Sequence, residues 1–574
     1  MPAHDRYGPG YIESVELPGD LLRTAAAAIA AGLEDGRFSP DEIRSWGKGL
    51  GYGRQVVFPL SYLYICPESE LRGDGRLLDA ARTLGEGLAG EDHFEHRMLW
   101  ALVESRRLLL DAGERETLRM TDEVAERSAG LIAERFEAAR HVTHITSANM
   151  GTSTNHIAVM AGALLRYGQD EGRPEWVDLA REMGLKVAAD QVRDGYWAET
   201  TGGPTMLYNY LTMCCMGRLF RATGEDAFGR AARRAAELHA RYAYPDGCNV
   251  ETVDGRCRYH ATPMMWGGFV FSETPEGRGF VALKLKTLLE HLGSVEKHPH
   301  SGELLALLCE DHMLWTPGEA APPACLRPRY TETLSVGGLV RREGPWTVTY
   351  ASPPHTPRPG ANFTIDRQNI FSVWHARTGL IVNGSGEDSR PEAATFRIDP
   401  SWAGEHRLQV PEIVTCDAGD SPGAAARLHA EYRGGTCRLE ALFCSGTELE
   451  IRAFAGCRDQ LYPVHLTVPL ELRYGAALEW GDGGRVGSAT LKEGESLAIA
   501  PGDLGGRLTF GDWRVEISSS GNAPASLEWP YDPHNPYSPD RKSPPGLHVG
   551  LLRIDLPPEG ARLRFTVRDG GGEE

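Results

Sequence analysis

The sequence has no apolar run long enough to cross a bilayer, which takes about 18 residues or more, so it predicts no transmembrane helix and no membrane partner. The first twenty residues, MPAHDRYGPGYIESVELPGD, lack the basic region and apolar stretch of a secretory signal. We therefore expect a cytoplasmic protein.

The sequence is also poor in clustered positive charge. Its net charge is −19, and no basic run extends beyond Arg233–Arg234 and their neighbours. A nucleic-acid-binding protein normally carries a basic stripe, so we expect no nucleic-acid partner. Overall acidity leaves room for a small cationic pocket that receives a short acidic substrate.

Zinc-type cysteine spacing is absent as well. The eleven cysteines form no CxxC pair and no Cys/His pattern, which favours reduced, buried thiols. We expect no cofactor and no catalytic metal.

A chain of 574 residues is too long for one hydrophobic core. From about Leu21 to Met313, apolar residues recur at three- and four-residue spacing, which predicts a series of helical hairpins. The proline-rich segment HMLWTPGEAAPPACLRPRY (312–330) interrupts this pattern, and beyond it the period changes to two. We therefore predict an α+β multidomain protein: an N-terminal (α/α) toroid over residues 1–320 and a C-terminal antiparallel β-sandwich over 321–574.

Polar residues gather in HVTHITSANMGTSTNHIAVMAGALL (141–165), just ahead of an apolar helix. Helix capping can explain one of the residues 153–155, because a side-chain oxygen there accepts a bond from a free backbone N–H. Capping does not require Asn155 and His156 together, with Asn149 close by. We regard these three side chains as candidate site residues.

Two further stretches carry more polar and aromatic side chains than packing needs. In DGYWAETTGGPTMLYNYLTM (194–213), a Gly-rich loop opens onto a helix whose first turns hold Tyr208 and Tyr210. In CRYHATPMMWGGFVFSETPEG (257–277), His260 and Trp266 stand in a loop. Amphipathic packing of the tyrosines and a buried, satisfied histidine are the structural alternatives.

These stretches resemble the helical-toroid polysaccharide lyases, the heparinase II/III-like and alginate-lyase-like group. In that group an Asn-His pair precedes an Asp-Gly-x-x-x-Glu-x-x-Gly-Pro-like stretch that leads to the catalytic Tyr. Here the distance from Glu199 to Gly203–Pro204 is one residue longer. The later stretch RQNIFSVWHARTGLIVNGSGEDSRPEAATF is similar to the sandwich domain that follows the toroid.

The resemblance implies β-elimination on an acidic oligosaccharide or polysaccharide that contains uronic acid. Asn155 would neutralise the substrate carboxylate, and His156 or a tyrosine would remove the C5 proton. Tyr208 or Tyr210 would return a proton to the leaving O4 oxygen, and which of them does so stays open. His260 is a second candidate base.

Other residues are expected to bind the sugar or to adjust the charge of the site. They are Asn149, Arg193, Glu199 and Trp266 in the helical half, with Arg367 and His375 reaching from the β-half. The related sandwich domains sometimes hold a structural divalent ion. We find no clear ligand set for one among His375, Asp366, Glu387, Asp388 and His548.

Two other functions remain open. Helical toroids also carry glycoside hydrolases with paired carboxylates, for which Asp194 and Glu199, then Glu251 and Glu273, are candidates. A non-catalytic carbohydrate-binding protein could use the same aromatic residues only to stack on sugar rings.

Overall fold

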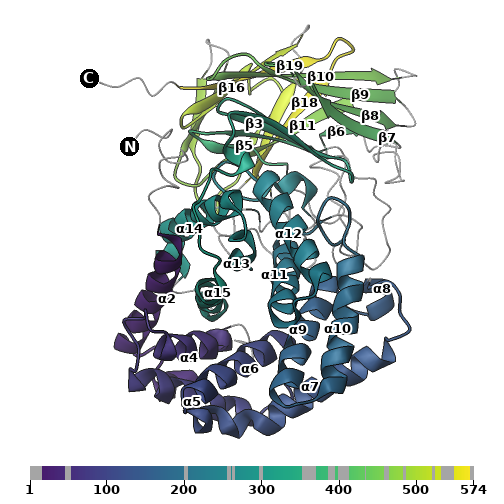
Figure 1. The fold of residues 1–574 in the computed structure, drawn as a ribbon. Coiled ribbons are helices and arrows are strands. Elements are labelled where there is room, and N and C mark those ends of the chain that lie inside the picture. The colour runs from purple at the N-terminus through teal and green to yellow at the C-terminus, as the bar shows by residue number, and fades with distance from the viewer. Residues whose placement is uncertain are drawn as a thin grey trace.

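The computed structural model describes residues 16–45, 53–145, 147–198, 204–254, 260, 266–295, 301–351, 370–384, 395–398, 413–419, 421–432, 435–457, 464–481, 486–519, 524–531 and 549–568. Helices make up the first half of the chain and strands the second, and Figure 1 shows the strands stacked over one end of the helical half.

An inner row of helices is apolar around most of its circumference. In α4, for example, every side chain from Val57 to Leu63 is buried. Such helices must be covered on all sides, and outer amphipathic helices supply the cover. The inner helices are α4 (Val57–Ile65), α6 (His96–Asp111), α9 (Thr154–Asp170), α11 (Met206–Thr223), α13 (Gly268–Phe271) and α15 (Ser301–Leu314).

The outer helices alternate with the inner ones along the chain. They are α2 (Leu17–Glu34), α5 (Gly75–Ala89), α7 (Asp122–Ala138), α10 (Pro174–Ala189), α12 (Asp226–Arg241) and α14 (Pro275–Val295), and the short α3 (Pro40–Ser45) and α8 (Ser147–Met150) lie between them. Helix α9 packs between α6 and α11, and the ring closes where α15 packs against α4 and α2. Because most outer helices return the chain to the same end, the N-termini of the inner helices gather there.

The β-half consists of two antiparallel sheets that face each other. The ten-stranded sheet contains β1 (Arg329–Leu334), β2 (Gly338–Glu343), β3 (Trp346–Ala351), β4 (Ile370–His375), β5 (Gly379–Val382), β6 (Phe396–Ile398), β11 (Val464–Glu471), β14 (Leu497–Ile499), β17 (Ala525–Tyr531) and β18 (Val549–Leu556). The nine-stranded sheet contains β7 (Ile413–Ala418), β8 (Ala426–Tyr432), β9 (Gly435–Phe443), β10 (Glu448–Cys457), β12 (Ala477–Gly481), β13 (Val486–Thr490), β15 (Arg507–Phe510), β16 (Trp513–Ser519) and β19 (Ala561–Val567).

Alternating burial shows why these segments form a sandwich. In β8 the side chains of Ala426, Leu428, Ala430 and Tyr432 are buried, and those between them are more exposed. One face of each sheet thus supplies the shared core, as the period-two pattern predicts.

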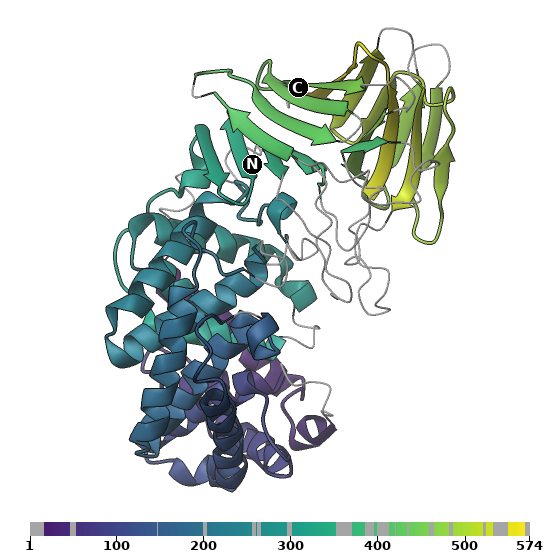
Figure 2. The ribbon, with the colours of Figure 1, turned by 90° about the vertical axis from the view of Figure 1, so that its right-hand side faces the viewer.

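The two halves share a third apolar cluster. Tyr242, Tyr244 and Val253 of the helical half pack with Val340 and Trp374 of the ten-stranded sheet. The first residue of α11 belongs to the same cluster, so the sheet lies over the end of the toroid where that inner helix begins. Figure 2 shows this stacking from the side.

The predicted order of a helical toroid followed by an antiparallel sandwich is confirmed. Among the described residues, the last α-helix ends at Leu314 and the first strand begins at Arg329. Within the described ranges, no helix combines the length and the apolar character needed to cross a membrane.

Candidate functional site

The first turn of α9 presents Asn155 in an arrangement that capping does not explain. The N-cap residue Ser153 makes no side-chain capping bond, and its hydroxyl donates instead to Oδ1 of Asn155. Asn155 is 1% exposed, and its Nδ2 has no hydrogen-bond partner among the described residues. A buried amide donor without a partner costs about 1–3 kcal/mol, which suggests that it serves a ligand.

The next residue, His156, is half-buried and faces a second histidine. Its Nδ1 lies 2.9 Å from Thr152 Oγ1, and its ring centroid lies 4.9 Å from that of His96. Burial, together with the nearby charges of His96 and Arg97, lowers the pKa of His156 to about 4. His156 is therefore neutral at pH 7 and has a free electron pair for a proton.

His96 begins α6 and is held by its own neighbour. Glu95 caps this helix by accepting from the backbone N–H of Arg97, and its Oε1 lies 2.9 Å from His96 Nε2. Burial acts to raise the pKa of Glu95, but the bond to His96 and the charges of His96 and Arg97 lower it on balance. Glu95 stays ionised and places its carboxylate against the imidazole of His96.

Behind this pair lies a buried ion pair that ties α6 to α15. Arg97 Nη1 lies 3.2 Å from Oε1 of Glu303, and the indole Nε1 of Trp266 donates to the same oxygen. Burial raises the pKa of Glu303, and Arg97 opposes that rise. The site is thus built from the starts of α6, α9 and α15 and from the segment that leads into α13.

The two tyrosines differ sharply in their surroundings. Tyr210 is fully buried, stacks on His239 with ring centroids 3.6 Å apart, and donates to Oδ1 of Asn249. Burial raises the pKa of Tyr210 well above its ordinary value. Tyr208 is half-buried in the first turn of α11, the helix beside α9, at the end of the ring where His156 lies.

The other predicted residues do not all converge on this pair. Trp266 is buried beside Glu303, whereas Asn149 is exposed and donates to the backbone of His144. Arg193 is exposed on the loop after α10. His260 is buried, and its backbone oxygen accepts from Asn249 near the β-half.

His375 lies inside the β-half and not at the toroid. Its ring contacts Trp346 edge-on at 4.5 Å, and its Nε2 lies 3.1 Å from the backbone oxygen of Gly446. The remaining predicted positions lie outside the described residues: Glu199, Arg367, Asp366, Glu387, Asp388 and His548. In the part of the chain that is described, no three metal-ligating side chains come together.

Sequence reasoning missed Glu95, His96, Arg97 and Glu303. The stretch EDHFEHRMLW places charged and histidine side chains directly before an apolar helix, the same pattern that drew attention to Asn155 and His156. That repetition was the available signal. Glu303 carried no such signal because a single glutamate in a helix is usually a solvated one.

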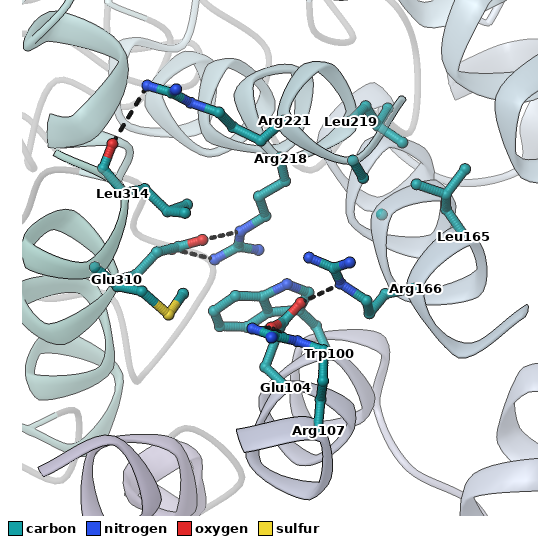
Figure 3. A pocket seen from close by; sticks show the side chains of 13 residues that line it. Trp100, Glu104, Arg107, Leu165, Arg166, Arg218, Leu219, Arg221, Glu310 and Leu314 are labelled. Atoms are coloured by element: carbon teal, nitrogen blue, oxygen red, sulfur yellow. Dashed lines mark hydrogen bonds and ion pairs between the residues drawn. The ribbon is translucent and has the colours of Figure 1, made fainter. Parts of the chain in front are cut away.

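A small cavity of about 120 Å³ lies at the other end of the inner helices (Figure 3). Both carboxylates in its lining are bonded by arginines: Arg218 bonds Glu310 through two nitrogens, and Arg107 and Arg166 bond Glu104. A fourth arginine, Arg221, donates to the backbone oxygen of Leu314 and to Thr316. The Arg218 guanidinium also lies 3.4 Å from the ring centroid of Trp100. This network ties α6, α9, α11 and α15 together, and we assign it a structural role.

The chain matches no known family profile and no curated protein sequence. Among solved structures it is similar to heparinase III, with 10% identity, a TM-score of 0.49, and coverage of 90% of this chain and 76% of that one. It is also similar to the chondroitin AC lyase of Streptomyces coelicolor A3, with 14% identity, a TM-score of 0.46, and coverage of 100% and 82%. A third similar structure is the heparan sulfate lyase HepC of Pedobacter heparinus, with 9% identity and a TM-score of 0.45. The match covers 90% of this chain and 75% of HepC.

All three similar structures are lyases of the helical-toroid kind that the motif stretches resemble.

Proposed function

We propose that this protein is a lyase that cleaves a uronic-acid glycosidic bond in an acidic oligosaccharide or polysaccharide by β-elimination. The observation that carries the proposal is the neutral His156, whose ring lies 4.9 Å from that of His96. Glu95 contacts His96 on one side, and Asn155, the residue before His156, has an Nδ2 without a hydrogen-bond partner among the described residues. These groups supply the two things that the reaction needs, a positive receptor for a carboxylate and a base.

Neutralisation of the uronate carboxylate comes first. The C5 proton becomes acidic only when the negative charge of the adjacent carboxylate is balanced. Asn155 Nδ2 provides a donor, Arg97 beside His96 provides a cation, and the first turns of α6 and α9 add the positive ends of their helix dipoles. Each donor is fixed before substrate arrives, so little reorganisation is required.

Proton transfer then follows a balanced path. His156 accepts the C5 proton, the C4–C5 double bond forms, and the C4–O4 bond breaks. Tyr208 donates its phenolic proton to the departing O4 oxygen. No water is consumed. A bound carboxylate also offsets the charges of His96 and Arg97, which raises the pKa of His156 and makes it a stronger base when substrate is present.

Hydrolysis by paired carboxylates is less well supported. Asp194 accepts two bonds from Ser335, and Glu273 pairs with Arg233. Glu251 is fully buried and accepts from Ser372.

Glu95 and Glu303 have the opposed pKa shifts that a hydrolase uses for its base and its acid. Glu303 is 4% exposed, however, beneath Arg97 and Trp266, where it cannot reach a glycosidic oxygen.

The test is incubation with uronate-containing glycans of different types, followed by ultraviolet and mass analysis of the products. β-Elimination yields a conjugated, unsaturated uronate that absorbs in the ultraviolet, whereas hydrolysis yields saturated products heavier by one water. A protein that only binds sugar yields neither product.

A further inference from the structure

The exposed face of the nine-stranded sheet carries a polar groove on the side of the sandwich away from the helices. Figure 1 shows β16 and β19 above β3 and β5, with the helical half below them. Cross-strand pairing aligns Glu479, Thr509, Arg514 and Thr566 in one row across β12, β15, β16 and β19. Alternate residues of a strand face the same side, so Arg507 shares this face.

The groove encloses about 470 Å³ and is richer in positive than in negative charge. Three guanidiniums line it, those of Arg507, Arg514 and Arg568, against the single carboxylate of Glu479. Arg514 forms an ion pair of 3.6 Å with Glu516, a residue that does not line the groove. Within the described ranges, Arg507 and Arg568 form no ion pair. In a protein of net charge −19, such a local excess marks a place where an anion is attracted.

Hydroxyl groups stand between these cations. Thr447, Thr509 and Thr566 line the groove, and Oγ1 of Thr566 is buried without a hydrogen-bond partner among the described residues. Thr566 is the direct cross-strand neighbour of Arg514. A guanidinium beside a free hydroxyl matches a carboxylate or sulfate group, whose oxygens accept from both.

We propose that this groove is a second, non-catalytic binding site for an anionic saccharide, which places a carboxylate or sulfate group among Arg507, Arg514 and Arg568. The volume accommodates more than a single oxyanion, and the row of threonines extends the polar contacts along a sugar. The saccharide identity rests on the proposed function, whereas the oxyanion chemistry rests on the groove alone.

The experiment measures binding without cleavage. In a His156→Gln background, a uronate-containing oligosaccharide is titrated by calorimetry into three forms of the full chain. These are the parent, the double variant Arg507→Ala/Arg568→Ala, and the control Arg562→Ala. Arg562 is an exposed arginine on the same sheet face, outside the groove lining.

The parent and the control should bind two saccharides per chain. The double variant should bind one tightly and the other at least roughly tenfold more weakly, because bonds to charged groups are lost. A double variant that binds like the control, or a parent whose only bound saccharide is retained by the double variant, overturns the proposal. Binding of inorganic sulfate without saccharide binding overturns it too, because the groove is then an oxyanion site only.

Cleavage is measured in parallel with His156 intact, so the two proposals fail separately. If no glycan is cleaved but the double variant loses one bound saccharide, the lyase proposal fails and the groove stands. If glycan is cleaved and the double variant still binds two saccharides, the groove fails alone. Turnover of a short substrate should be the same in the double variant and in Arg562→Ala.

Discussion

His96 and His156 face each other from the first turns of neighbouring inner helices, with ring centroids 4.9 Å apart. Glu95 lies 2.9 Å from His96, whereas the Nδ1 of His156 lies 2.9 Å from the Thr152 hydroxyl. His96 and burial lower the pKa of His156, which keeps the His156 ring neutral. The proposed reaction therefore uses His156, and not His96, as its base.

Replacing the base should abolish most activity without unfolding the chain. His156→Gln keeps a polar side chain of similar length but cannot carry a proton, so kcat should fall by about 10²–10⁴. His144→Gln is the matched control, because His144 lies ahead of the same helix, is largely exposed and pairs with Asp190. Both variants should have the parent's far-ultraviolet circular dichroism. An equal fall of kcat in both variants, or an unchanged kcat in both, would contradict the role of His156.

The dependence of kcat/KM on pH should reveal the electrostatic coupling between His96 and His156. Activity needs neutral His156, so kcat/KM should fall as pH drops through the pKa of this residue, about 4 in the free protein. The charge of His96 contributes to that low value, so His96→Gln should raise the pKa of His156 and move the acid limb to higher pH. Rate profiles and imidazole NMR titrations measure the shift. A limb that stays in place, or moves to lower pH, would show that the rings are not coupled.

The amide of Asn155 should matter for catalysis and little for folding. Asn155→Asp replaces the free donor by a second negative charge facing the substrate carboxylate, so kcat/KM should fall by about 10²–10³. Asn155→Leu removes the donor without adding charge, so its kcat/KM should fall by less than that of Asn155→Asp. The difference between the two variants measures carboxylate neutralisation. Equal losses would indicate that Asn155 only shapes the site.

The tyrosines offer a paired comparison on one helix. Tyr208→Phe should lower kcat strongly, because the proposed acid loses its proton. Tyr210→Phe loses the bond to Asn249, which should cost about 1 kcal/mol of unfolding free energy and leave kcat nearly unchanged. Steady-state rates and urea unfolding separate the two effects. The reverse pattern would move the acid role to Tyr210.

The ion-pair network around Arg218 and Glu310, at the far end of the toroid, should stabilise the fold and take no part in catalysis. Glu310→Ala leaves the buried guanidinium of Arg218 without its carboxylate, which should destabilise the fold by about 3–5 kcal/mol. Glu116→Ala removes an exposed partner of Arg119 and should cost about 1 kcal/mol or less. Urea unfolding provides both values. A Glu310→Ala variant as stable as Glu116→Ala would contradict the structural role of the network.

The sequence predicted the fold better than the site. Helical and strand periods are local, so the change near the proline-rich segment 312–330 located the two architectures. Asn155, His156 and the two tyrosines Tyr208 and Tyr210 became candidates because they are polar residues clustered beside apolar helices. His96 meets His156, and Glu303 meets Arg97, only through packing of α6 and α15 within the ring, a relationship that no local pattern carries.

The same reasoning explains the ambiguity over the tyrosines. Tyr208 and Tyr210 are two residues apart, so on a helix they point in different directions. The sequence does not say which direction is the core. The structure places Tyr210 against His239, which makes Tyr208 the residue left at the site end of the helix.

The central claim is elimination at the His96–His156 pair, and isotope analysis of the products tests it most directly. Cleavage of a uronate-containing glycan is run in water enriched in heavy oxygen and followed by ultraviolet absorbance and mass spectrometry. The account predicts an unsaturated uronate at the new end, no heavy oxygen in either product, and loss of both signals in His156→Gln. Saturated products that contain heavy oxygen, or unsaturated product formed undiminished by His156→Gln, would contradict it.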